Sequence, residues 1–341
     1  MNSDLANEKI NNLLEYLLAN GSHLVIDGDT HPTDLSTLEG NIRDRFKETT
    51  DYYQGRPISP EQLIQSMDCS GVDMSLTWQN PAAFDYGEDE SENFQRLLRA
   101  NQDIARFAEK YPTRFIPAGW TDPKSLGVEY ACKLAEICVQ DLGFTIVKMN
   151  PAQNSFPIDS PMVKTVVDKI VQLGAASAFH FGGDSPFTPP SGFKKLLEQY
   201  PKHPFIGVHM GGGGSHYVDG DDTYIGARSL GIEHPNLFYV ISAKRDCHLE
   251  TDMVLYFEKG APYAQNLGWG SDAPYGLQSW NLGGSKELIN SLSKQVSMSR
   301  PVNDPKLYGG DNLSGYMGSN LARIVIKSAK NILAKNNITV S

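Results

Sequence analysis

The chain has 341 residues and a mass of 37.6 kDa, enough for one large domain or two ordinary ones. Apolar residues make up 40% of it and charged residues 21%, which permits a sizeable core and argues against global disorder. The formal net charge of −10 argues against a nucleic-acid binder and against attraction to an anionic membrane surface. No apolar run in the sequence is long enough to span a bilayer.

Residues 1–21 predict a helical extension that precedes a single domain over residues 22–341. The apolar residues that lie close to one helical face are Leu5, Ile10, Leu13, Leu14, Leu17 and Leu18. This pattern predicts a docking helix, with a targeting or partner-binding helix as the alternative. The segment has neither the cationic start nor the continuous apolar stretch of a signal peptide. Only four cysteines occur, without CxxC spacing, which predicts reduced thiols and a cytoplasmic protein.

Eight short segments rich in apolar and β-branched residues recur along the chain, and each is followed by polar residues or glycine. They are His23–Asp29, Val72–Trp78, Phe115–Trp120, Phe144–Asn150, Ala176–His180, Phe205–His209, Phe238–Ser242 and Leu267–Asp272. From the third onward their ends are about thirty residues apart, the length of one βα unit. The helical periods between them lie at residues 91–110, 126–142, 160–173 and 192–200.

This alternation predicts an α/β fold with a parallel sheet, of the size of a distorted (β/α)8 TIM barrel. A doubly wound open sheet is disfavoured because no GxGxxG-type loop follows the first strand. Two long stretches, residues 32–60 and 273–312, follow the first and last strands. They predict walls or a lid above the carboxyl ends of the strands, or else ordinary surface loops. Residues 313–333 predict a closing helix.

Polar side chains with metal-ligand chemistry stand at four of the predicted strand ends. Asp29 and His31 end the first strand and are two residues apart, so both can point to the same side of an extended chain. His180, His209 and Asp272 end the fifth, sixth and eighth strands. Each residue alone has an ordinary structural explanation, such as a turn or a helix cap. Their coincidence at the mouth of one barrel predicts a divalent-metal site, because imidazole and carboxylate are ligands of borderline metals.

These segments together resemble the amidohydrolase superfamily, in particular the branch that contains aminocarboxymuconate semialdehyde decarboxylase and related aromatic-acid decarboxylases. The resemblance spans about residues 22–335 and is carried by residues 26–32, 179–182, 207–212 and 270–274 (IDGDTHP, FHFG, GVHMGG and GSDAP). It implies one divalent metal ion, with zinc as the default and manganese as the substitute. The implied ligands are Asp29, His31, His180 and Asp272. The family's first motif is usually His-x-His, and the carboxylate of Asp29 in its first position makes the ligand set harder.

The resemblance also implies catalytic roles for His209, which would activate water or polarise the substrate, and for Asp272, which would relay a proton. Three further residues are predicted to bind the substrate. Lys148 ends the fourth strand as a substrate-facing cation, a buried ion-pair partner or a carbamylated bridge between two metals. Arg245 follows the seventh strand and suits a substrate carboxylate, with surface pairing as the alternative. Trp78 lines an aromatic pocket or packs in the core.

The function predicted first is a metal-dependent hydrolase. It would use a metal-activated water on an amide, ester, lactone or related bond of a small, carboxylated substrate. The alternative is a non-oxidative decarboxylase (carboxy-lyase) of an aromatic or unsaturated acid, which would use the same ligands. Third comes an inactive barrel used for binding. The expected partners are a small-molecule substrate and a second copy in a homodimer, with no nucleic acid and no membrane.

Overall fold

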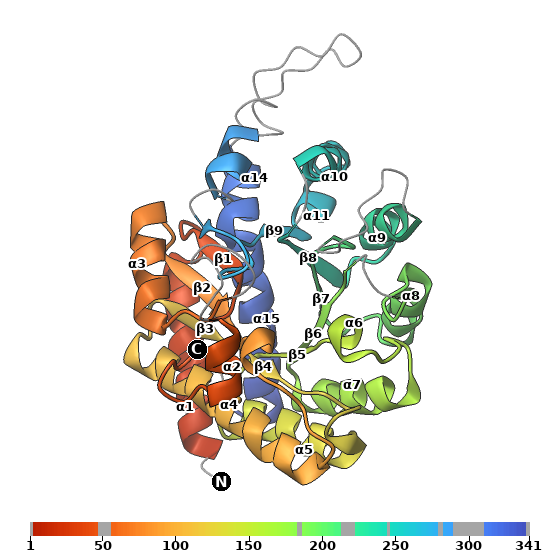
Figure 1. The fold of residues 1–341 in the computed structure, drawn as a ribbon. Coiled ribbons are helices and arrows are strands. Elements are labelled where there is room, and N and C mark those ends of the chain that lie inside the picture. Colours follow the sequence, from red (N-terminus) through yellow and green to blue (C-terminus); the bar gives the residue numbers. More distant parts are fainter. Residues whose placement is uncertain are drawn as a thin grey trace.

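The computed structural model describes residues 3–46, 56–182, 186–212, 222–243, 246–278, 282–288 and 310–338. Its strands are β1 (Ile26–Thr30), β2 (Met74–Thr77), β3 (Phe115–Pro117), β4 (Gly119–Trp120), β5 (Ile146–Met149), β6 (Ala176–His180), β7 (Phe205–Val208), β8 (Leu237–Ile241) and β9 (Leu267–Trp269). All neighbouring strands are parallel, in the orders β1-β2-β3 and β4-β5-β6-β7-β8-β9. They lie at the centre of the molecule, with helices outside them (Figure 1).

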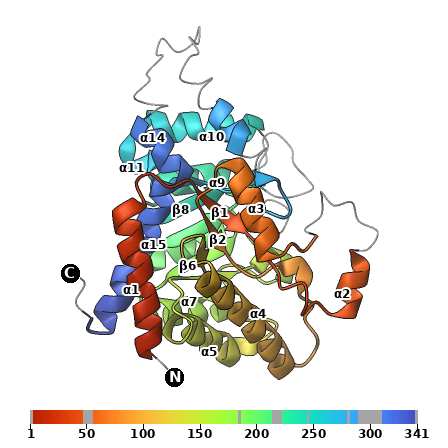
Figure 2. The same cartoon turned by 90° about the vertical axis from the view of Figure 1, so that its left-hand side faces the viewer.

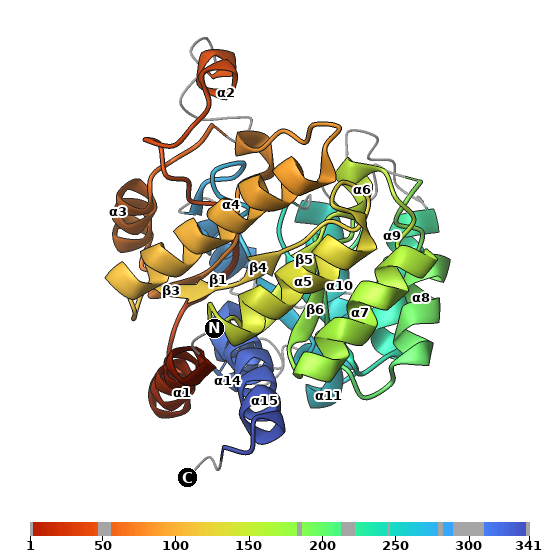
Figure 3. The ribbon, with the colours of Figure 1, turned by 90° about the horizontal axis from the view of Figure 1, so that it is seen from below.

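The helices between the strands are α2 (Gly40–Arg45), α3 (Pro60–Ser70), α4 (Glu90–Lys110), α5 (Gly127–Gln140), α6 (Pro151–Asn154), α7 (Pro161–Leu173), α8 (Pro190–Gln199), α9 (Asp222–Glu233), α10 (Asp246–Glu258) and α11 (Ala261–Ala264), with the 3-10 turn η1 (Pro81–Ala83). Residues 282–288 are also helical. Helices α4, α5, α7 and α8 follow one another around the outside of the strands (Figure 3). Each presents a stripe of buried apolar residues to them. The four helices predicted between strands are therefore present.

The predicted strand over residues 115–120 is divided into β3 and β4. Pro117 has no N–H group to donate, which interrupts the regular ladder at this position. Ala118 still donates its N–H to the carbonyl oxygen of Thr77 at 2.9 Å, and β4 then pairs with β5. The eight predicted strand positions are thus occupied in order, with the third one shared between two short strands.

Few backbone contacts join β1 to β9 and the residues that follow it, within the described part of the chain. The N–H of His31 donates to the carbonyl oxygen of Ala273 at 2.7 Å, next to a single parallel bridge between Thr30 and Ala273. The buried carboxylate of Asp27 accepts from the N–H of Ser271 at 2.8 Å and from its hydroxyl at 2.5 Å. Burial raises the pKa of Asp27 to about 6. The Asp27 side chain therefore adds hydrogen bonds between β1 and the segment after β9, where the backbone pairing is short. The parallel α/β barrel is distorted at this junction.

The two ends of the described chain pack together. Helix α1 (Ser3–Asn20) buries Ala6, Ile10, Leu14 and Leu17 and lies along α15 (Asn320–Lys335), as Figures 1 and 3 show. The closing segment begins with α14 (Gly310–Ser314) and a π-helical turn, η2 (Gly315–Ser319). A Cβ atom on Gly318 would lie only 2.1 Å from the carbonyl oxygen of Leu24, so this close approach requires glycine. The predicted docking of the N-terminal helix is observed from Ser3 onward, and the predicted closing helix is observed as well.

The stretch predicted as a wall or surface loop, residues 32–60, contains α2 and leads into α3. Helix α2 stands away from the rest of the barrel (Figure 2). Helix α3 begins with a capping box between Ser59 and Gln62 and ends at Gly71 in a left-handed conformation. None of the helices in the described part of the chain combines the length and the apolar character needed to traverse a bilayer.

A histidine outside the predicted metal site is also buried. His203 precedes β7, and its Nε2 lies 2.9 Å from the hydroxyl of Ser177. Its ring packs against Phe205 with centroids 4.8 Å apart. Burial, assisted by the charges of Lys327 and Lys335, lowers the pKa of His203 to about 3. The native protein therefore holds this ring neutral.

We expect the free energy of unfolding of His203→Gln to fall less between pH 7 and pH 4 than that of the wild type. Below the ordinary histidine pKa of about 6.5 the unfolded chain binds a proton that the native state does not, so stability is lost as pH falls toward 3. Between pH 7 and 4 this difference amounts to roughly 3 kcal/mol in the wild type. The Gln amide reaches Ser177 but does not titrate. Urea unfolding at several pH values measures the effect, and parallel profiles for the two proteins would contradict it.

Candidate metal centre and substrate pocket

The carboxyl ends of the strands bring together the side chains that the sequence singles out. Asp29 lies in β1 with His31 just beyond it, and Asp272 follows β9. Each of these three residues places one ligand atom within 4.8 Å of the others. His31 Nε2 lies 3.3 Å from Asp29 Oδ1 and 3.5 Å from Asp272 Oδ1. His180, the last residue of β6, and His209, directly after β7, lie beside this cluster with ring centroids 4.5 Å apart.

The ring of His31 has a fixed orientation. Its Nδ1 lies 2.8 Å from the backbone carbonyl oxygen of Gln79, so Nδ1 carries the proton and donates it. In the neutral ring Nε2 then presents its lone pair to the carboxylates of Asp29 and Asp272. Burial alone would lower the pKa of His31, but hydrogen bonding to the two carboxylates raises it overall. A cation or a proton between these three groups satisfies all of them.

Asp29 is fully buried yet remains an anion. The indole N–H of Trp78 donates to its Oδ1 at 2.9 Å, and the hydroxyl of Ser242 donates to its Oδ2 at 2.8 Å. Burial alone would raise the pKa of Asp29, but Lys148 and His31 hold it well below its usual range. Lys148 Nζ lies 3.5 Å from Oδ1 of Asp29, a buried ion pair.

His180 carries an imidazole nitrogen that the protein leaves unused. The ring is buried, and its Nε2 makes no hydrogen bond within the described part of the chain. Burial and the neighbouring charges of His209 and Lys148 lower the pKa of His180 well below its ordinary value. Buried polar atoms normally have partners, so a neutral imidazole with a spare nitrogen indicates a ligand position.

His209 is joined to Asp29 through Ser242. Its Nδ1 lies 2.9 Å from the hydroxyl oxygen of Ser242, and that hydroxyl lies 2.8 Å from Asp29 Oδ2. A carboxylate only accepts, so Ser242 donates to Asp29 and accepts from the Nδ1–H of His209. The other ring nitrogen, Nε2, is then the one that can accept a proton. This chain of hydrogen bonds fixes the orientation of the His209 ring.

Several residues after the strands adopt left-handed backbone conformations that non-glycine residues rarely occupy. They are His209 (φ 77°), Met210 (φ 48°), Ala243 (φ 49°) and Asp272 (φ 60°). Such strain is retained where the surrounding structure over-determines it, and it concentrates at functional sites. Here the left-handed residues follow β7, β8 and β9, whose carboxyl ends border the cluster of Asp29, His31 and Asp272. Asp272 is the most open member of the cluster, with 14% of its side chain exposed.

The donor set, by which we mean Asp29, His31, His180 and Asp272, fits one divalent metal ion. It offers two carboxylates and two imidazoles, the ligand types of zinc and manganese sites. The unpartnered nitrogen of His180 and the fixed lone pair of His31 are both consistent with ligation. The surrounding hydrogen bonds from Trp78 and Ser242, and the carbonyl of Gln79, would orient the ligands as outer partners commonly do.

An aromatic cavity of about 330 Å³ adjoins His31. Ring centroids of Trp120 and Tyr275 lie 6.4 Å and 5.7 Å from that of His31, both edge-on. The residues lining the cavity are Gln79, Pro81, Ala82, Phe84, Tyr86, Trp120, Gln153, Asn154 and Tyr275. The hydroxyl of Tyr275 donates to Asn80 Oδ1 at 2.9 Å and is thereby fixed. We call this cavity the aromatic pocket, and its volume lies in the usual range for small-molecule sites, about 300–1,000 Å³.

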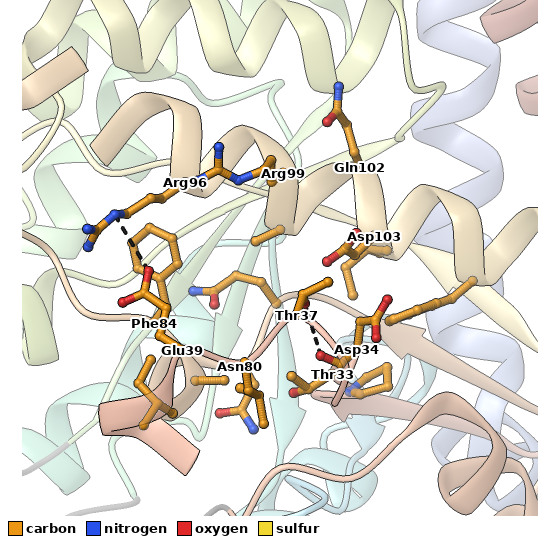
Figure 4. A pocket seen from close by; sticks show the side chains of 18 of the residues that line it. Thr33, Asp34, Thr37, Glu39, Asn80, Phe84, Arg96, Arg99, Gln102 and Asp103 are labelled. Atoms are coloured by element: carbon orange, nitrogen blue, oxygen red, sulfur yellow. Dashed lines mark hydrogen bonds and ion pairs between the residues drawn. The ribbon is translucent and has the colours of Figure 1, made fainter. Parts of the chain in front are cut away.

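A second cavity of about 400 Å³ lies between residues 32–42, residues 79–85 and helix α4 (Figure 4). Across it Arg96 faces Glu39 at 3.7 Å, and Arg106 pairs with Asp34 at 3.2 Å. Gln79 and Phe84 line both cavities. The loop after the first strand therefore contributes a wall next to the aromatic pocket, as the sequence predicts for residues 32–60.

The sequence profile of the amidohydrolase family matches residues 26–296, most of the chain. The chain belongs to the amidohydrolase family. The predicted superfamily, the α/β barrel fold and the prediction of an enzyme are thereby confirmed.

Solved structures share this amidohydrolase fold. The 5-carboxyvanillate decarboxylase of Sphingomonas paucimobilis is 18% identical, with 89% of this chain and 98% of that chain covered at a TM-score of 0.60. The 2,6-dihydroxybenzoate decarboxylase from Rhizobium is 16% identical, with 89% and 98% covered at 0.61. A mutant 5-carboxyvanillate decarboxylase of Novosphingobium aromaticivorans, solved with manganese and 3-methoxy-4-hydroxy-5-nitrobenzoic acid, is 13% identical, with 90% and 98% covered at 0.61.

The three residues predicted to bind substrate have different positions in this amidohydrolase. Lys148 is a buried ion-pair partner of Asp29, one of the alternatives that the sequence left open. Trp78 is fully buried and donates to Asp29, and its ring lies 3.9 Å from Lys148 Nζ. Arg245 lies outside the described residues. Trp78 and Lys148 therefore support the donor set from behind, and substrate binding by all three residues stays a prediction.

Sequence reasoning gave no role to Ser242, Gln79 or Tyr86. Ser242 ends a predicted strand, and this position is the only signal that could have drawn attention to it. Gln79 contributes its backbone carbonyl, which no side-chain pattern reveals. Tyr86 lies in the loop after β2, and its place in the aromatic pocket depends on how that loop folds back toward Trp120.

Replacing Ser242 with Ala is expected to lower kcat while leaving the metal content near that of the wild type. The change removes the hydroxyl that links His209 to Asp29, although Asp29 keeps the Trp78 N–H and the Lys148 ammonium, so a loss of about tenfold is a reasonable scale for a positioning residue. The pH profile of kcat should shift as well, because the hydroxyl that accepts from the Nδ1–H of His209 is removed and only the longer contact to the backbone carbonyl of residue 242 remains. A variant with an unchanged profile and rate would show that the chain of hydrogen bonds is not used.

Proposed function

We propose that this amidohydrolase is a metal-dependent, non-oxidative decarboxylase of an aromatic or closely related unsaturated carboxylic acid. The observation that carries the proposal is the aromatic pocket next to His31, where Trp120 and Tyr275 flank the donor set. A flat, conjugated acid could place its acidic group at the donor set and its ring between these side chains. The decarboxylase names of the fold neighbours support the same interpretation.

The proposed metal is manganese, with zinc as the alternative. Two carboxylates in a set of four make the site harder than an all-imidazole set, and carboxylate ligands suit manganese. The neighbour solved with bound manganese supports this choice. When bound, the ion would supply Lewis-acid polarisation of a carboxylate or phenolate oxygen of the substrate.

The chain's own residues would then handle the proton. In the decarboxylation the bond between the ring carbon and the carboxylate carbon breaks, its electron pair stays on the ring carbon, and CO2 leaves. The ring carbon takes one proton in exchange. Asp272 is the candidate donor because its side chain is the most open of the cluster. His209, oriented through Ser242, is placed to return a proton to the site.

Hydrolysis, the function predicted first from the sequence, would use the same side chains to activate water. The decisive assay incubates the manganese-loaded protein with hydroxylated benzoic acids and, separately, with lactones and amides. We expect one CO2 per product molecule and, in heavy water, one deuterium on the ring carbon that lost the carboxylate. Hydrolysis of a lactone or amide with no CO2 release from any acid would overturn the proposal.

A further inference from the structure

Lys148 is enclosed at the metal centre instead of being exposed to solvent. Only 1% of its side chain is exposed, and its Nζ lies 3.5 Å from Oδ1 of Asp29. The ring centroid of Trp78 lies 3.9 Å from the same Nζ, and that of Trp120 lies 5.0 Å from it. Aromatic faces attract cations at such distances. One carboxylate and two aromatic rings therefore surround a cation at this position.

Asp29 thus has a partner of opposite charge before any metal ion binds. Among the described residues, no other lysine or arginine pairs with a member of the donor set. Burial lowers the pKa of Lys148, whereas the charges of Asp29 and Asp272 favour its charged form. A metal ion that binds Asp29 must share this carboxylate with the ammonium, and the two cations repel each other. The ion pair therefore opposes metal binding.

The same ammonium changes the total charge of the site once a metal ion is bound. Asp29 and Asp272 contribute one negative charge each, Lys148 contributes one positive charge, and the imidazoles of the donor set are neutral as ligands. A divalent ion then leaves the site with one positive charge. Without Lys148 the loaded site would be neutral. A buried unit charge several ångströms away changes the binding of an anion by roughly tenfold or more.

We propose that Lys148 is a built-in counter-cation of the metal centre, which weakens metal binding at Asp29 and strengthens the binding of a substrate carboxylate to the loaded site. The second effect rests on the proposed function, in which that carboxylate lies at the donor set. Lys148 is a positioning residue in this scheme, because it contacts Asp29 and acts on the metal ion and the substrate through its charge. In the metal-free protein the same charge keeps Asp29 an anion.

Lys148→Met tests both effects by binding measurements. The variant replaces the ammonium with a neutral thioether, which adapts well to the irregular space between Trp78 and Trp120. We expect manganese to bind about tenfold more tightly, as measured by competition with a chelator. Salicylate, a simple hydroxylated benzoic acid, should bind the manganese-loaded variant about tenfold more weakly in calorimetry. Structural damage alone would weaken both, so shifts of opposite sign identify the charge.

Two further variants control for fold and for position. Lys148→Gln keeps a hydrogen-bond donor for Asp29 without the charge, so it should show the same two shifts, and it replaces the Met variant if that protein does not fold. Lys124→Met is the matched control. The ammonium of Lys124 is exposed and donates to the carbonyl oxygen of Ser155 at 3.2 Å. Water and salt screen that charge, so both affinities should stay at their wild-type values.

The outcomes separate this role of Lys148 from the proposed reaction. Any other combination of the two affinities in Lys148→Met, such as weaker manganese binding or unchanged salicylate binding, would overturn the counter-cation. Wild-type affinities in Lys148→Gln would overturn it as well, since a hydrogen bond would then suffice. Release of CO2 is scored independently. Opposite shifts without CO2 release from any acid would refute the proposed reaction alone, whereas CO2 release without the shifts would refute the role of Lys148 alone.

Discussion

Replacing His180 with Ala should reduce bound metal from about one ion per chain to a small fraction and abolish turnover. The substitution removes an imidazole whose Nε2 is buried and unpaired by protein in the described chain. Loss of an outer partner typically weakens metal binding by about 10–100-fold, so loss of a direct ligand should cost at least that much. The fold should survive, because the ring makes no hydrogen bond through that nitrogen. Elemental analysis and thermal unfolding of the unchelated protein measure both expectations.

His209→Ala is the matched control for this experiment. His209 has a ring centroid 4.5 Å from that of His180, but its Nδ1 is occupied by Ser242. It should therefore keep near-stoichiometric metal while turnover falls by about 10²–10⁴-fold, the usual contribution of a general acid or base. Unchanged metal content in both variants would show that the donor set is assigned wrongly. Two ions per wild-type chain would instead point to Lys148 as a carbamylated bridge.

Much of the fold could be predicted because the barrel repeats a local pattern. Each βα unit buries an apolar strand and one stripe of a helix, so the periodicity is present in every segment. The division of the third strand was not predicted, since it depends on the missing N–H of Pro117 within an apolar run. Helix α3 lies between the loop after the first strand and the second strand, and the only sequence signal for its start is the short capping box of Ser59 and Gln62. The burial of His203 depends on tertiary packing against Phe205 and Ser177.

The candidate site was predictable to the extent that strand ends define it. Asp29, His31, His180 and Asp272 follow from topology, because parallel strands bring their carboxyl ends to one face. The groups that tune them come from elsewhere. Ser242 shares its hydroxyl between two site residues, Gln79 acts through its backbone, and Tyr86 approaches from a loop. These positions depend on how distant segments meet in the folded chain, and a single sequence contains no motif for such contacts.

Asp272→Asn is expected to lower decarboxylation by about 10²–10⁴-fold while leaving the fold and most of the metal in place. The residue adopts a left-handed backbone conformation with φ 60°, which Asn tolerates about as well as Asp, so the substitution adds little strain. The amide oxygen of Asn remains a ligand for a hard cation, but the side chain no longer supplies an acidic proton. Asp272→Ala should additionally lose stability, because Ala is disfavoured in this conformation.

Three measurements on Asp272→Asn separate its two roles. Metal content reports ligation, salicylate titration reports binding at the site, and CO2 release reports the chemistry. Asp34→Asn is the control. Asp34 pairs with Arg106 in the second cavity, so this variant should leave metal content, salicylate binding and CO2 release unchanged. A variant that keeps metal and ligand but loses CO2 release assigns the proton to Asp272. A variant that keeps all three transfers that role to His209, whose Nε2 is the remaining proton carrier oriented at the mouth of the barrel.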